Sequence, residues 1–277
     1  MKKILVTTDF SSNSKAGLRF AIQLAKQEKV KLTFFHSYYI MRPTSWNDVK
    51  FAVYEKGELK KIQTRFEKFV KAVYKSAHTA IKKVECVLSE SVLVDSNIID
   101  YAKLYNYDYI CISTRGAGKF KRIFGTNTSN VIKNSAVPVL AVPHRYRSNK
   151  IQSVLYASDL IDLDKELIKV LEFTKTLKPT IELLHFDFPQ EIAAKQKIMS
   201  AAKKKYSKQK IKLHLEDINV AKDFTANIES AVKRSKPSLL IMFHHKNKDI
   251  FDKIFVPSYS AEYSFDAKVP MLVFNKA

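Results

Sequence analysis

Short apolar runs alternate with amphipathic helical patterns along the first half of the chain. Residues 4–6 form a β-branched run that ends at polar residues, which predicts a buried strand. Apolar side chains then recur at helical spacing over residues 17–25. The pattern further predicts strands over 32–37, 84–88, 109–113 and 137–142 and a loop over 42–48. A long amphipathic helix is expected after this loop, with apolar residues from 59 to 77 on one face, and further helices over 98–104 and through 131–132. Residues available to cap these helices are Ser11, Ser12 and Asn13 for the first and Asp95 or Ser96 for a later one. Alternating strands and helices predict an α/β fold with a doubly wound parallel sheet.

The same order of elements restarts in the second half of the chain. The run 154–159 echoes 5–9, the run 181–185 echoes 32–36, and the run 269–273 echoes 137–141. Three matches in one order, at similar offsets, indicate a tandem duplication of a whole domain. We therefore expect two five-stranded parallel-sheet domains, over residues 1–146 and 147–277, with the joint near 145–150.

Composition narrows the class of protein. A hydrophobic fraction of 46% with 12% aromatic residues excludes a disordered chain. Two cysteines in 277 residues cannot form a disulfide scaffold and favour a reducing compartment. No apolar run approaches the roughly 20 residues that span a bilayer, and polar residues end the first run too early for a signal peptide. We expect a cytoplasmic protein with no membrane partner.

The chain is strongly basic, with 48 Lys plus Arg against 27 Asp plus Glu and a formal net charge of +21. Such an excess attracts polyanions and allows non-specific nucleic-acid binding. The lysines are scattered through the amphipathic helices, however, and no aromatic–basic RNA motif or helix-turn-helix is recognisable. We expect a solvated basic surface and no specific nucleic-acid site.

A glycine-rich stretch links the fourth predicted strand to the next helix. Only five glycines occur in the chain, all in its first half, and three of them lie in this stretch. Glycines let the backbone approach a ligand closely, and the free N–H groups of a helix start favour phosphate. Asp9 ends the first strand beside the same crevice and could bind a ribose hydroxyl. The candidate nucleotide-binding residues are Asp9, Ser113, Arg115, Gly116, Gly118, Gly125, Thr126, Asn127 and Thr128. A tight turn followed by an ordinary capped helix explains the same residues, and local chemistry leaves both interpretations open.

Asp9, the Arg115-Gly116 turn, the Gly125-Thr126 helix start and the last strand with Pro138 together resemble the universal stress protein family. The resemblance covers nearly the whole chain as two tandem copies. It implies ATP or another adenine nucleotide as ligand, magnesium as an accompanying ion, phosphates on Gly116, Gly125 and Thr126, and Asp9 near the adenosine. ATP-binding members carry Gly, two residues, Gly, nine residues, Gly, then Ser or Thr. In this chain Ser113 stands in place of the first glycine, and eight residues separate Gly116 from Gly125. The family further implies weak hydrolysis or none, so we expect no enzyme.

The second copy lacks the glycine-rich pattern. Counting back from the matched Pro138 and Pro270 puts Pro257 in the place of Gly125, and residues 246–250 in the place of the glycine turn. Proline donates no N–H group to a ligand. We expect the second domain to bind no nucleotide in the family manner. It would instead pair with the first as two subunits would, giving an intramolecular pseudo-dimer that could dimerise further.

Other reactive side chains fit structural roles. His36 and His185 match between the copies, which predicts a repeated structural contact. Cys86 and Cys111 lie on different predicted strands and are expected to be buried thiols. No P-loop, zinc-ligand spacing or activated nucleophile is present in the sequence.

Three functions remain open from the sequence. The first is a stress-response sensor or scaffold that binds an adenine nucleotide in its first domain and acts on an unknown protein partner. The second is a nucleotide-free interaction platform of the same fold. The third is a non-specific nucleic-acid binder.

Overall fold

The computed structural model describes residues 1–81, 84–114, 126–147, 149–188, 190–219, 224–245 and 269–276. The first half contains β1 (Lys2–Thr7), α1 (Lys15–Ala25), β2 (Val30–Tyr38), α2 (Asp48–Ser76), β3 (Glu85–Glu90), α3 (Val94–Leu104), β4 (Tyr109–Thr114), α4 (Thr126–Asn134) and β5 (Val139–Pro143). The second half contains β6 (Ser153–Ala157), α5 (Leu163–Thr174), β7 (Thr180–Asp187), α6 (Ile192–Lys205), β8 (Ile211–Asp217), α7 (Phe224–Ser235), β9 (Leu239–His245) and β10 (Met271–Lys276). Strands and helices alternate as the hydrophobic pattern predicts.

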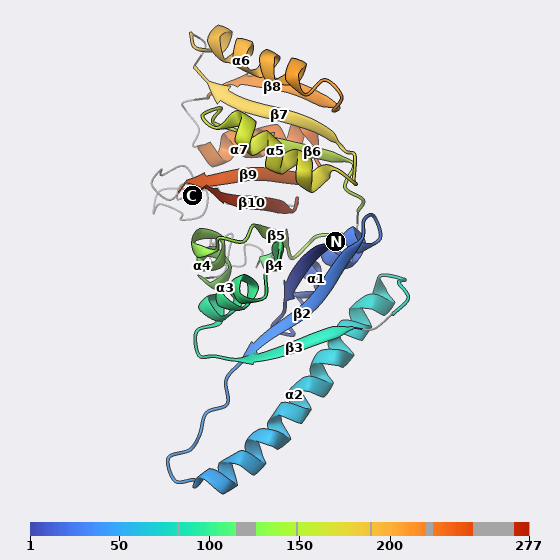
Figure 1. Cartoon of the computed structure of the whole chain (residues 1–277), viewed down its shortest axis with the longest axis vertical. Helices are drawn as coiled ribbons and strands as arrows, with labels where there is room; N and C mark the ends of the chain where they lie inside the picture. Colours follow the sequence, from blue (N-terminus) through green and yellow to red (C-terminus); the bar gives the residue numbers. More distant parts are fainter. Residues whose placement is uncertain are drawn as a thin grey trace.

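The strands that the structure describes form one ten-stranded sheet with the order β3-β2-β1-β4-β5-β10-β9-β6-β7-β8 (Figure 1). Within each half the strands are parallel, and the two halves have the same order read from the outside inward. The halves meet where β5 pairs antiparallel with β10, with Leu140 opposite Leu272. The predicted class, two doubly wound five-stranded units, is confirmed, and backbone hydrogen bonds join the two units edge to edge.

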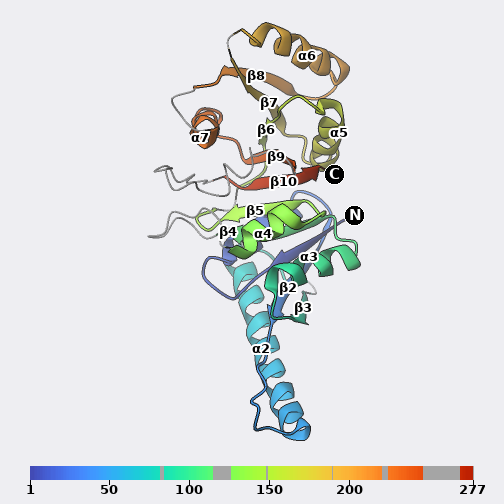
Figure 2. The same ribbon diagram turned by 90° about the vertical axis from the view of Figure 1, so that its left-hand side faces the viewer.

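Helices cover both faces of this sheet and enclose two apolar layers. One layer packs against α1, α2, α5 and α6, and the other against α3, α4 and α7. Figure 2 shows α5 and α7 on opposite faces of the second half. Successive residues of β1 contribute to different layers, with Ile4 and Val6 in one and Leu5 in the other. Strands buried on both faces need continuous apolar runs, which is the pattern the sequence shows.

Polar contacts also cross the seam between the halves. The Glu28 side chain, only 2% exposed, pairs with Lys2 at 2.9 Å and accepts a hydrogen bond from Thr176 of the second half. Lys2 Nζ also donates to the Phe173 carbonyl at 2.7 Å. On the other face, Asn275 Nδ2 donates to the Ile132 carbonyl at the end of α4 at 2.9 Å. The seam is therefore held by specific hydrogen bonds as well as by the shared sheet.

The predicted helix caps are wrong. Ser14, rather than Ser11, Ser12 or Asn13, is the residue that precedes α1, and its side chain makes no capping bond. The Ser14 hydroxyl instead donates to the Ser11 carbonyl at 2.9 Å, within the turn after β1. Leu93 precedes α3, and Asp95 lies in its first turn without capping it. The hydroxyls of Ser11 and Ser14 thus bond within the turn before α1, and the Asp95 carboxylate accepts a hydrogen bond from Asn130 of α4 at 2.6 Å.

Among the residues that the structure describes, no helix is both long and apolar enough to cross a membrane.

Candidate functional site

A cavity of about 320 Å³ opens at the carboxyl ends of β1, β2 and β4, beside the start of α4. Ligands of doubly wound sheets bind at this edge. Five of the predicted site residues line the cavity, namely Asp9, Ser113, Thr126, Asn127 and Thr128. Hydroxyl and amide side chains of Thr8, Ser11, Asn13, Ser14 and Ser37 join them, and apolar side chains of Val94, Ile98 and Ile112 form part of the wall. The predicted Arg115, Gly116, Gly118 and Gly125 lie outside the described residues.

Asp9 is held in a tight turn at the mouth of the cavity. Its Oδ1 accepts a hydrogen bond from the Ser11 amide at 2.9 Å, and Phe10 between them has a left-handed φ of 62°. Burial by itself would raise the pKa of Asp9. Hydrogen bonds from Ser11 and Ser14 outweigh that effect, and the pKa lies below its ordinary 3.8. Asp9 is therefore a fixed negative charge at neutral pH.

The second half repeats this turn. Asp159 Oδ1 accepts from the Ile161 amide at 3.0 Å, and Leu160 has a φ of 63°. His185 Nδ1 lies 2.8 Å from the Ser158 carbonyl, and His36 Nδ1 lies 2.8 Å from the matching Thr8 carbonyl. The two histidines thus make the same backbone contact, as the sequence predicts.

His36 also forms part of the cavity wall. Its ring lies 4.1 Å from the Phe10 ring, and the phenyl ring of Phe66 lies beyond. Burial lowers the pKa of His36 below 6.5, despite the opposing hydrogen bond to Thr8 and the nearby charge of Asp9. The imidazole is therefore neutral at pH 7 and acts as a packed wall rather than as a cation for phosphate.

Ser113 faces α1 as well as the cavity. Its Oγ accepts from the Gly17 amide at 2.7 Å and donates to the Ser14 carbonyl at 3.0 Å. The Gly17 amide lies in the first turn of α1, where helix N–H groups have no partner within the helix. A Cβ on Gly17 would lie 2.8 Å from this Oγ. The serine that replaces the first family glycine therefore caps α1 from a neighbouring strand.

The start of α4 presents polar side chains at the cavity. Thr128 is buried, and its hydroxyl lies 3.4 Å from the Ser113 carbonyl, which ties the helix to β4. Thr126 and Asn127 are exposed and line the cavity. This arrangement offers hydroxyl, amide and backbone N–H donors to an anion at a helix start.

The described residues carry neither a candidate metal cluster nor an activated thiol. Among the residues that the structure describes, no cluster of three or more His, Cys, Asp and Glu side chains could hold a metal ion. Cys86 and Cys111 are free thiols on β3 and β4, which β2 and β1 separate. Burial raises the pKa of Cys86 to about 11 and also raises that of Cys111, so neither is an activated nucleophile.

Large side chains occupy the corresponding crevice of the second half. The strand registers place Cys111 and Ile241 at equivalent positions, since Val6 pairs with the first and Tyr156 with the second. Phe243 therefore stands where Ser113 stands in the first half. Its ring stacks on Phe274 at 4.8 Å and meets Tyr156 at 5.8 Å. An aromatic group thus replaces the small hydroxyl.

The same register corrects the predicted position of the turn that corresponds, in the second half, to the glycine turn of the first. The equivalent residue of Thr114 is His244, whereas counting back from the prolines gives Lys246. The difference arises because the two copies differ in length between the fourth strand and the last strand. Pro257, Ser258 and residues 246–250 lie outside the described residues.

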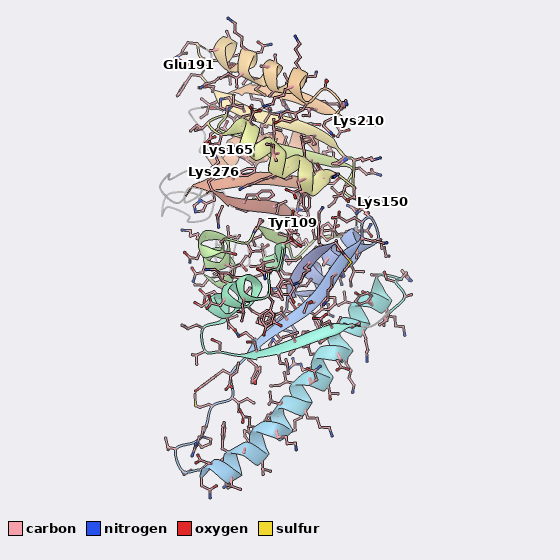
Figure 3. The ribbon with its side chains drawn as sticks, in the orientation of Figure 1. Tyr109, Lys150, Lys165, Glu191, Lys210 and Lys276 are labelled. Atoms are coloured by element: carbon pink, nitrogen blue, oxygen red, sulfur yellow. The ribbon has the colours of Figure 1, made fainter. Side chains whose placement is uncertain are left out.

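Sequence reasoning missed a buried ion cluster in the second crevice. Lys276, labelled in Figure 3 at the end of β10, contacts Glu166 of α5 and lies 3.4 Å from Asp159 Oδ1. The Glu166 carboxylate also accepts from the hydroxyls of Tyr156 and Ser158. Burial raises the pKa of Tyr156 well above 10, and Glu166 adds to this effect, so the phenol stays protonated. No local signal could reveal the pairing, because 110 residues separate Glu166 from Lys276.

Comparison with known proteins agrees with this geometry. The family model of the universal stress protein family matches residues 1–143, which is more than half of the chain. The chain belongs to the universal stress protein family. A universal stress protein from Archaeoglobus fulgidus has a similar structure over both halves, with a TM-score of 0.68, 18% identity, and coverage of 99% of this chain and 98% of that one. This likeness over the full length agrees with the prediction that the chain is a tandem, two-domain member of the family.

Other similar structures belong to the same family. A putative universal stress protein from Pseudomonas aeruginosa aligns with a TM-score of 0.59 and 12% identity, covering 99% of this chain and 93% of that one. A universal stress protein in complex with cAMP covers 51% of this chain and 97% of its own, with 20% identity and a TM-score of 0.39. Among curated proteins, none matches this chain.

Proposed function

We propose that the first half of this universal stress protein binds ATP or another adenine nucleotide in the cavity and acts as a sensor or scaffold for a protein partner. The observation that carries the proposal is the convergence of Asp9, Thr126 and Asn127 on one cavity at the carboxyl edge of the sheet. Its volume of about 320 Å³ lies within the range of small-molecule sites.

The lining suggests how the ligand would lie. Asp9 is an acceptor suited to ribose hydroxyls, while Thr126 and Asn127 stand at a helix start suited to phosphate. Val94 and Ile98 offer an apolar wall for a base. Contacts of phosphate with Arg115, Gly116, Gly118 and Gly125, and an accompanying magnesium ion, stay predictions from the family resemblance. Binding through the segment from Arg115 to Gly125 would alter a surface for the protein partner.

We expect one nucleotide per chain. In the second half Ile161 and Leu163 stand where the first cavity has Ser11 and Asn13, and Phe243 stands in place of Ser113. Three carboxylates, those of Asp159, Asp162 and Glu166, surround Lys276 and would repel phosphate. With domains over 1–146 and 147–277, the second domain would serve as the partner half of a pseudo-dimer.

A single hydroxyl deletion tests the site. Thr126→Val removes a donor from the cavity while keeping the shape of the side chain. Loss of a hydrogen bond to a charged group costs about 1.5–3 kcal/mol, so the Kd for ATP should rise roughly tenfold to a hundredfold in calorimetry. Thr64→Val, at an exposed position on α2, is the matched control and should leave the Kd unchanged.

A backbone variant tests the predicted phosphate cradle. Gly125→Pro removes one N–H donor, while Gly57→Ala on exposed α2 controls for loss of a glycine. Equal weak heats from wild type and Gly125→Pro would remove the nucleotide proposal. We expect slow ATP turnover or none, because the described cavity holds no activated nucleophile.

A nucleotide-free interaction platform is the second candidate. It is favoured by Ser113, whose hydroxyl is engaged by Gly17 and Ser14 rather than left for a ligand. Mass spectrometry of the purified protein separates the candidates. Co-purified adenine nucleotide supports the first, and none after millimolar soaking supports the second. Non-specific nucleic-acid binding is abandoned if labelled DNA and RNA fail to shift at low salt.

We also propose a cytoplasmic location. The described cysteines are both free, and free thiols suit a reducing compartment.

A further inference from the structure

The long helix α2 extends well beyond the body of the protein. It has 29 residues, which corresponds to about 43 Å at 1.5 Å per residue. Its buried residues, Phe66, Val70 and Val73, all lie in its second half. Figures 1 and 2 both show the first half of the helix, with the loop before it, projecting away from the sheet. This projecting part can therefore reach a flat surface before the rest of the molecule does.

Apolar side chains gather on this projection, which we call the α2 tip. It comprises Tyr39, Met41, Trp46, Val49, Val53 and Tyr54. Met41 and Val49 are each 75% exposed and Val53 is 72% exposed. Tyr39 and Tyr54 are exposed as well. Exposed aliphatic and aromatic residues in one projecting segment mark an interaction site more often than scattered ones do.

The α2 tip is ordered by its own contacts. Arg42 pairs with Asp48 at 2.6 Å and donates to the Trp46 carbonyl at 2.9 Å, which folds the loop back onto the helix. The Trp46 ring meets Tyr54 edge-on at 5.0 Å, and Lys50 Nζ lies 4.7 Å from the centre of the indole. Met41, Val49 and Val53 stay exposed in this arrangement, so folding of the tip does not account for their apolar character.

The charge around the α2 tip is positive. Residues 39–61 carry Arg42, Lys50, Lys56, Lys60 and Lys61 against Asp48, Glu55 and Glu58. Two of the three acidic groups are paired within the segment, Asp48 with Arg42 and Glu58 with Lys61. The whole chain carries a net charge of +21. The tip therefore combines exposed apolar groups with a cationic surround.

We propose that the α2 tip docks onto the surface of an anionic lipid bilayer. Met41, Val49 and Val53 would enter the boundary between headgroups and acyl chains, and Trp46 and Tyr54 would lie at headgroup level, where such residues are enriched. The lysines would face anionic headgroups, whose diffuse negative charge needs no individually placed carboxylates. This contact would be peripheral and involves no spanning segment, and it differs from the expectation of no membrane partner.

A second copy of the chain and an acidic protein fit the α2 tip less well. Two chains of +21 each would repel one another at the point where their lysines meet. A specific acidic protein would favour cations grouped in one direction, whereas Lys56 points about 120° away from Lys50 and Lys61, which share one side of the helix.

The lone tryptophan of the chain makes the proposal directly measurable, because Trp46 lies in the α2 tip. With vesicles of phosphatidylcholine and phosphatidylglycerol at about 70:30, whose anionic headgroups attract basic segments, emission should shift to the blue. Brominated acyl chains should quench it, and salt should weaken binding. Pure phosphatidylcholine vesicles should bind far less.

Paired variants assign the effect to the α2 tip. Val49→Ser with Val53→Ser removes two exposed aliphatic groups that would enter the bilayer, and it should weaken sedimentation with the anionic vesicles by roughly tenfold or more. Met41→Ser, which lies outside the helix, should weaken it without any change in helix content. Leu104→Ser, at a 71% exposed position at the end of α3, is the control and should bind as wild type does.

Several results would overturn the proposal. The proposal fails if wild type stays in the supernatant at low salt, or if the tip variants sediment as wild type does. An emission shift that depends on protein concentration without vesicles would assign the surface to a second copy. A shift with an acidic polypeptide but none with vesicles would assign it to a protein. None of these outcomes depends on nucleotide binding.

Discussion

Replacing Gly17 with alanine tests the close approach of α1 to β4. The new Cβ would lie 2.8 Å from Ser113 Oγ and 3.3 Å from the Ser113 backbone nitrogen. The hydroxyl must then move away, which breaks its hydrogen bonds to the Gly17 amide and the Ser14 carbonyl. An unsatisfied buried group costs about 1–3 kcal/mol, whereas alanine in place of a helical glycine stabilises by up to about 1 kcal/mol. We expect Gly17→Ala to destabilise the protein by about 1–2 kcal/mol, since the first effect is larger.

The matched control is Gly57→Ala. Gly57 also lies inside a helix, but a Cβ there would meet nothing within 4 Å. The same chemical change should therefore stabilise the protein by about 0.5–1 kcal/mol. Urea unfolding followed by circular dichroism measures both variants, and native-state hydrogen exchange at residue 17 reports whether its amide has lost its acceptor.

A double-mutant cycle identifies the hydroxyl as the cause. Ser113→Gly alone removes the cap on α1 and should cost about 1–2 kcal/mol. On that background Gly17→Ala no longer meets the hydroxyl and should be close to neutral. Interacting residues give a coupling energy of about 0.5–3 kcal/mol. If Gly17→Ala stabilises wild type as Gly57→Ala does, or if the two changes at 17 and 113 simply add, the inferred contact is wrong.

Three other predictions concern partly buried titratable groups. The folded pKa of His36 lies below 6.5, so the contribution of the neutral His36 ring to stability is present above pH 6.5 and is lost as pH falls toward the folded pKa. In urea titrations at several pH values, His36→Asn should flatten this loss. His78→Asn, at an exposed position, should not flatten it. Lys276→Met should destabilise the second half by about 3–5 kcal/mol, because the substitution leaves the carboxylates around position 276 without their cation. Lys165→Met, at an exposed position, is the control and should change thermal stability little. Equal effects of the two substitutions would contradict the buried cluster. The pKa of Cys86 is raised to about 11, so a thiol reagent at pH 8 should label Cys86 slowly in the folded protein and fast in the urea-unfolded protein. Rapid labelling of Cys86 in the native protein would refute this prediction.

Most of the secondary structure was predictable because its signals are local. The β-branched run at residues 4–6 and the helical spacing at 17–25 depend only on near neighbours, and the structure has β1 and α1 there. The crevice was predictable in part, since parallel strands end at one edge and therefore bring Asp9 and Ser113 together. The caps were not predictable, because a hydroxyl such as that of Ser14 has several acceptors within reach and the turn decides among them.

The sequence alone determined the order of strands and helices and the duplication. It also determined the contrast between a half that contains glycines and a half that contains none. The tertiary structure decided what each exceptional residue does. Ser113 caps a helix 96 residues earlier in the chain, and Lys276 meets a carboxylate 110 residues away. β5 pairs with β10 through backbone hydrogen bonds. Because any apolar edge strand can make such bonds, the sequence does not specify this neighbour. Periodicity records which face of an element is buried, but it carries no information on which distant partner covers that face.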